Sequence, residues 1–116
     1  MAVSASAVDL LARMPGPATA EWPHGEPYVI AFDHGTMSVG LYAPVGLDPQ
    51  TPHEQDEVYI VRSGSGTLVI DDKRVAATAG TALFVPARVK HRFEDLSADF
   101  STWAVFWGPS GGEPDR

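Results

Sequence analysis

The stretch TPHEQDEVYIVRSGSGTLVI, residues 51–70, places polar side chains at the entrance of an apolar, β-branched segment. Two such segments flank a Ser-Gly-Ser-Gly sequence, which is typical of strands joined by a tight turn. Alternate side chains of an extended chain point to one face. On that basis one face carries Thr51, His53, Gln55, Glu57 and Tyr59. The pattern predicts a strand whose entrance directs an imidazole and a carboxylate to the same side.

The period of two continues along most of the chain. We expect strands at 28–33, 36–43, 57–62, 66–71, 81–85, 90–95 and 101–107. We interpret the Gly-, Pro- and Asp-containing connections, including DDKR at 71–74 and ATAG at 77–80, as turns. Many short strands with frequent turns predict an all-β antiparallel sandwich or barrel.

The first residues follow a helical period instead. Apolar residues recur at Ala7, Leu10, Leu11 and Met14, and Ser4 or Ser6 is available as N-cap. The Pro-Gly-Pro sequence at 15–17 ends this segment, so we expect a short helix of about two turns packed outside the barrel. We therefore divide the chain into a helix and irregular arm at 1–27, a barrel at 28–108 and a flexible tail at 109–116.

The composition argues against several classes of function. The chain has 116 residues, 44% of them apolar, and a formal charge of -7 without a basic block. These values fit one domain and argue against nucleic acid or an anionic membrane as partner. The absence of cysteine excludes disulfides and thiolate metal sites. No apolar segment approaches the ~20 residues that span a bilayer, and no basic signal region begins the chain, so we expect a cytoplasmic protein.

Histidine and carboxylate on one face form half of a divalent-metal site with nitrogen and oxygen ligands. For His53 and Glu57 the alternative is a strand end at which both side chains bond to backbone or water. A second polar cluster, GTALFVPARVKHRFED at 80–95, presents His91 at the start of a predicted strand.

Together the two stretches resemble the paired motifs of the cupin family. In the first motif, Glu57, six intervening residues and Gly64 fit, His53 takes the second histidine position, and Thr51 replaces the first histidine. In the second motif the matching residues are Gly80, Pro86 and His91, while Arg88 replaces a glycine and Asp95 an asparagine. The resemblance covers roughly residues 36–107.

This resemblance implies a double-stranded β-helix, or jelly roll, with a cavity that holds a metal or a substrate. It implies His53, Glu57 and His91 as ligands of a divalent transition metal, which could be iron, manganese, nickel or zinc. Gln50, Thr51 or Gln55 could add an oxygen ligand, and Gln55 is the one we include. The alternative is a metal-free pocket in which a histidine hydrogen-bonds or transfers protons.

Other residues keep more than one interpretation. Tyr59 is either a catalytic donor or a core residue. Trp103 and Trp107 share one face of the last strand and line a pocket, the core or a dimer face. The basic concentration at Arg88, Lys90 and Arg92 either attracts an anionic substrate or balances nearby acids.

The cupin repertoire implies an enzyme of the dioxygenase, isomerase, epimerase or lyase type acting on a small molecule. The alternative is a binding module for a sugar or small acid, which Thr51 favours. Open sheet edges and the Trp- and Phe-rich last strand predict a homodimer.

Overall fold

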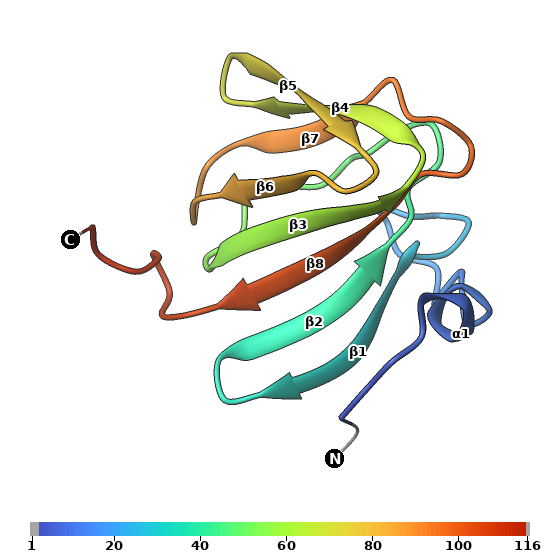
Figure 1. The fold of residues 1–116 in the computed structure, drawn as a ribbon, viewed down its shortest axis with the longest axis horizontal. Coiled ribbons are helices and arrows are strands. Elements are labelled where there is room, and N and C mark those ends of the chain that lie inside the picture. The colour runs from blue at the N-terminus through green and yellow to red at the C-terminus, as the bar shows by residue number, and fades with distance from the viewer. Residues whose placement is uncertain (1–2, 116) are drawn as a thin grey trace.

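The computed structural model describes residues 3–115, in which the chain forms one short helix and eight strands (Figure 1). In chain order the elements are α1 (Ala7–Leu11), β1 (Tyr28–His34), β2 (Met37–Tyr42), β3 (Asp56–Ser63), β4 (Ser65–Ile70), β5 (Lys73–Thr78), β6 (Ala82–Val85), β7 (His91–Glu94) and β8 (Ser101–Trp107). This all-β content with a single short helix confirms the predicted fold class.

The strands form two antiparallel sheets, as Figure 1 shows. The larger sheet has the order β1-β2-β8-β3-β6, and the smaller sheet has the order β5-β4-β7. The last strand, β8, lies between β2 and β3, so the middle of the larger sheet is formed by pairings between strands distant in sequence. This connectivity places β3 and β7, which carry the predicted ligands, in opposite sheets.

The core fills the space between the sheets. Phe93 of β7 contacts Tyr59 of β3 with a ring separation of 4.8 Å, and it contacts Phe100 at 5.0 Å. Phe93, Tyr59 and Phe100 are all buried. Glu57 has the same parity as Tyr59 on β3 and therefore points toward the same interior.

Strand β5 was not predicted, because residues 71–74 and 77–80 were interpreted as turns. This interpretation was right at residues 71–72 and 79–80, which form turns, and wrong between them: β5 pairs with β4 along Lys73–Thr78 at the edge of the smaller sheet. Only Ala77 of this strand is buried. An exposed edge strand has little apolar alternation for a sequence pattern to reveal.

The helix is shorter than predicted, because it ends at Leu11 rather than near Met14. Ser6 occupies the N-cap position, although its side chain makes no capping hydrogen bond. Buried Leu10 anchors the helix, which contacts β1 and β2. No helix within residues 3–115 has the length and apolar character needed to cross a membrane.

Segments at both ends of the chain are bonded to the rest. In the arm, the Pro27 carbonyl accepts from Ala43 N–H, just after β2, at 2.9 Å. In the tail, Gly111 N–H donates to the Glu54 carbonyl at 2.7 Å, and Glu113 N–H donates to buried Asp56 at 2.9 Å. The sequence pattern predicts none of these bonds.

Candidate metal centre

Three titratable side chains meet in the interior between the sheets. His53 lies just before β3, Glu57 lies on β3, and His91 is the first residue of β7. The Nε2 atoms of His53 and His91 lie 2.8 and 3.7 Å from the same Glu57 oxygen. One ligand atom from each residue falls within 4.8 Å of the other two. The fold therefore brings together the three residues that the family resemblance implied as ligands.

Both imidazoles are oriented by backbone carbonyls. His53 Nδ1 donates to the Gln55 carbonyl, and His91 Nδ1 donates to the Val89 carbonyl, each at 2.8 Å. A carbonyl is only an acceptor, so in each ring Nδ1 carries the proton and Nε2 is turned toward Glu57. Such bonds commonly fix the tautomer and orientation of histidines that bind metals.

His91 Nε2 is the least satisfied atom of the group. It is buried and has no hydrogen-bond partner, and His91 as a whole is only 2% exposed. Buried polar atoms in proteins normally have a partner, because desolvation without a hydrogen bond is costly. A lone pair directed at a carboxylate and a second imidazole fits a divalent cation, which would satisfy it. The donor set of this site therefore fits a metal.

The two histidines have opposite pKa shifts. Burial lowers the pKa of His53, but the hydrogen bond to Glu57 and the charge of that carboxylate outweigh it, so the pKa is raised above 6.5. Burial is also the largest influence on His91, where it outweighs the Val89 carbonyl and the charge of Glu57, so the pKa is lowered. His91 is therefore neutral at neutral pH, whereas His53 holds a proton against Glu57 more readily.

The turn before β7 positions His91 relative to His53. Arg88 stands at the glycine position of the second motif and has a φ of 66°, a conformation that glycine adopts without strain. Its N–H donates to the His53 carbonyl at 2.7 Å, which joins the two histidine segments. Its guanidinium pairs with Glu54 at 2.9 Å, and Arg92 pairs with Glu94 at 2.6 Å. These pairs favour the interpretation that the basic side chains balance nearby acids.

Gln55 is directed elsewhere by its hydrogen bonds. Its amide nitrogen donates to the carbonyls of Thr36 and Gly108, at 2.9 and 3.0 Å. These bonds hold the entrance of β3 against the β1–β2 turn and the end of β8. Gln55 precedes the first residue of β3, so strict strand parity does not govern its direction. The proposed ligand set therefore does not include Gln55.

A buried polar network adjoins the three candidate ligands. Asp48, only 3% exposed, accepts hydrogen bonds from the Tyr42 hydroxyl, from both nitrogens of Gln50, and from Phe93 N–H. Gln50 Oε1 in turn accepts from the Tyr59 hydroxyl at 3.2 Å. The sequence did not single out Asp48, because Asp followed by Pro signals a local turn rather than a buried acceptor.

Tyr59 is a core residue and also a lining residue. It is 1% exposed, and burial together with the charge of Glu57 raises its pKa well above 10.0. The phenol therefore keeps its proton and acts as a hydrogen-bond donor. Its two interpretations from the sequence are compatible.

A cavity of about 200 Å³, which we call the narrow cavity, opens beside Glu57 and Tyr59. Phe106 of β8 and Tyr28 of β1 contribute walls, and Trp22 contributes from the arm. Phe106 also packs perpendicular to the His53 ring at 4.8 Å. The sequence assigned the arm no role here, because an irregular Pro- and Gly-rich segment shows no period that would orient its side chains.

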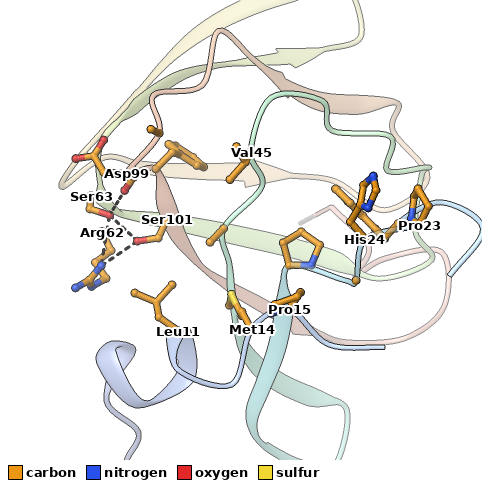
Figure 2. Close-up of a pocket in the computed structure, with 16 residues that line it drawn as sticks. Leu11, Met14, Pro15, Pro23, His24, Val45, Arg62, Ser63, Asp99 and Ser101 are labelled. Carbon is orange, nitrogen blue, oxygen red and sulfur yellow. Dashed lines mark hydrogen bonds between the residues drawn. The ribbon is translucent and has the colours of Figure 1, made fainter. Parts of the chain in front are cut away.

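A second cavity of about 780 Å³, the wide cavity, lies between the arm and the barrel, and none of the three candidate ligands lines it (Figure 2). Its lining is mostly apolar and includes Leu11, Met14 and Phe100. One end is polar, where Arg62 donates to the Ser101 hydroxyl at 3.2 Å. The larger of the two cavities is therefore not the one beside the candidate metal ligands.

A barrel of two antiparallel sheets that gathers two imidazoles and a carboxylate inside defines a class of small β-barrel proteins with candidate metal sites. Residues 39–104 match the family model described as the cupin domain. The match spans more than half of the chain, which belongs to the cupin family.

Individual proteins are similar to this chain. An uncharacterized protein of Streptomyces coelicolor is 43% identical over 75 residues, which make up 63% of this chain and 71% of that protein. The crystal structure of a cupin superfamily protein from Desulfitobacterium hafniense has 14% identity and a TM-score of 0.60, over 71% of this chain and 76% of that one. A Cupin 2 conserved barrel domain protein from Salinispora arenicola has 24% identity and a TM-score of 0.56, over 70% and 74%. These structures confirm the cupin fold.

Proposed function

We propose that the protein binds one divalent transition metal through His53, Glu57 and His91 and acts as an enzyme on a small molecule in the narrow cavity. The observation that carries the proposal is the buried, unpartnered Nε2 of His91, directed at Glu57 beside a second imidazole. Two imidazoles and one carboxylate leave coordination positions open for a substrate.

The bound metal would supply Lewis acidity toward a substrate oxygen. The residues of the chain supply orientation and protons. The Gln55 and Val89 carbonyls hold the imidazoles, and Phe106 packs against His53. Tyr59 retains its proton at neutral pH and donates a hydrogen bond to Gln50 Oε1, and the Gln50 amide nitrogen donates to Asp48. A substrate oxygen in place of Gln50 Oε1 would receive the hydrogen bond of Tyr59.

Metal titration of the intact protein tests the proposal. We expect one metal per chain in the wild type and an affinity at least about 100-fold lower in His53→Ala and His91→Ala, because each removes one of three ligands. His34→Ala is the matched control, since His34 is exposed at the end of β1. Equal affinity in all four proteins would show that neither histidine is a ligand.

A second candidate function is a metal-free binding module. Thr51 replaces the first motif histidine, and His53 and Glu57 already satisfy one another at 2.8 Å. Under this alternative the wild type binds transition metals no more tightly than His91→Ala does. The same titration separates the two functions.

A further inference from the structure

The narrow cavity has an unusual combination of walls. Its aromatic residues are Trp22, Tyr28, Tyr42, Tyr59 and Phe106. Its charged residues are Glu21, Glu26 and Glu57, and no lysine or arginine within residues 3–115 lines it. Aromatic faces and carboxylates both attract cations, whereas an anionic ligand would find no positive side chain in these walls.

The aromatic walls are built into the fold. Tyr42 packs edge-to-face with both Trp22 and Tyr28, each at a ring separation of 6.2 Å. The Tyr28 ring lies over Gly40, where a β-carbon would overlap it. Trp22 is held by the arm, since its backbone N–H donates to the Thr19 hydroxyl oxygen at 3.0 Å. Trp22 and Tyr28 remain half-buried, so their rings are accessible to a ligand.

The carboxylates of the cavity affect the tyrosines that line it. Burial and then the charges of Glu57 and Glu26 raise the pKa of Tyr28 to about 12. The pKa of Tyr42 is raised as well, by burial first and then by Asp48, with further contributions from Glu57 and Glu26. Two phenols on different strands thus lie in a negative potential. A metal held by His53, Glu57 and His91 would offset the charge of Glu57, but it would leave the charges of Glu21 and Glu26, which also line the cavity.

We infer that the narrow cavity binds a small organic ammonium compound, with its cationic head among Trp22, Tyr28 and Tyr42 near Glu26. Its other end carries an oxygen donor directed at the Glu57 end. The oxygen end rests on the proposed metal function, whereas the cationic end does not. The volume of about 200 Å³ sets the size, because sites for drug-sized ligands usually occupy about 300–1,000 Å³.

Calorimetric titration with choline tests this inference. The comparison ligand is 3,3-dimethylbutan-1-ol, which has the same shape and hydroxyl group but no charge, and acetate is the anionic comparison. We expect choline to bind at least about 10-fold more tightly than the neutral alcohol. Equal binding of choline and the alcohol, or tighter binding of acetate, would overturn the inference.

Variants locate the cationic end. Glu26→Gln and Trp22→Leu should each weaken choline binding by about 3- to 10-fold. Asp33→Asn, an exposed carboxylate on β1, and Phe84→Leu, an exposed ring on β6, are the matched controls and should bind as the wild type does. Equal losses in the controls and the cavity variants would contradict the assignment. Glu26→Gln keeps the test valid if Trp22→Leu alters folding.

Tetramethylammonium separates this inference from the proposed function, because it has no oxygen donor. We expect it to bind the wild type and His91→Ala to a similar extent, whether or not metal is present. Metal binding without tetramethylammonium binding would refute the inference and leave the proposed function standing. Tetramethylammonium binding without metal binding would retain the cationic end and remove the proposed metal.

Discussion

The narrow cavity beside Glu57 holds about 200 Å³, whereas the wide cavity beside α1 holds about 780 Å³. The narrow cavity is lined by Tyr59, which keeps its proton, and by buried Glu57, one oxygen of which lies 2.8 and 3.7 Å from two histidines. The wide cavity is lined mainly by apolar side chains between the arm and the barrel. The larger space is therefore not the candidate site, because the convergent titratable groups, among them two histidines with shifted pKa values, lie beside the smaller cavity.

Removing the charge of Glu57 should have the largest effect, because it weakens metal binding beside the narrow cavity. In Glu57→Gln an amide of similar shape replaces the only carboxylate in the ligand set, so we expect metal affinity to fall at least about 100-fold. Glu54→Gln is the matched control, because Glu54 is exposed and pairs with Arg88. Isothermal titration measures both variants. Unchanged affinity in Glu57→Gln would remove this carboxylate from the site.

Truncating Leu10 should affect stability without affecting the metal. Leu10 is buried on the helix that borders the wide cavity, and Leu10→Ala should lower the free energy of unfolding by about 2–5 kcal/mol. Val8→Ala on the same helix is the control, since Val8 is 66% exposed. Urea unfolding gives both values. A loss of metal affinity in folded Leu10→Ala would show that the two cavities are coupled.

Metal stabilisation should depend on pH through His53. The pKa of His53 is raised in the metal-free fold, so its own stabilising contribution is complete below 6.5 and is lost as pH rises through the folded pKa. Metal binding requires the deprotonated ring, so the metal affinity increases over the same rise in pH. We expect the increase in Tm caused by zinc to be larger at about pH 8 than at about pH 6.

Differential scanning calorimetry measures this difference, with His34→Ala as the control. His91 adds little to the pH dependence in that range, because its pKa is lowered. A zinc-induced increase in Tm that is the same at both pH values would contradict competition between the metal and the His53 proton.

A substitution on the outer face of the larger sheet should have the smallest effect on either cavity. Ile60 and Phe84 are 44% and 54% exposed there, and the ring of Phe84 lies 6.3 Å from that of Trp107. The homodimer expected from the sequence stays a prediction, and this apolar face is where we place it. Phe84→Glu should give a monomer with unchanged metal affinity. Sedimentation velocity at micromolar concentration measures this, and a monomeric wild type would contradict it.

Periodicity and short motifs were sufficient to predict much of the molecule. The period of two predicted seven of the strands, and the spacing of His53, Glu57, Gly64 and His91 carried the family resemblance. Local patterns succeed here because one buried face imposes alternation on each strand. The edge strand β5 buries only Ala77, and most of its residues were assigned to turns.

Tertiary structure alone decided how distant segments meet. The distances among His53, Glu57 and His91 depend on how β3 and β7, in opposite sheets, pack across the core. The same packing buries Asp48 beneath Phe93 N–H and folds the arm so that Trp22 and Glu26 line the narrow cavity. A sequence pattern records which way a side chain points along its own strand. It does not record which residue the fold brings to the opposite side, because that pairing arises only when both sheets bury their apolar faces together.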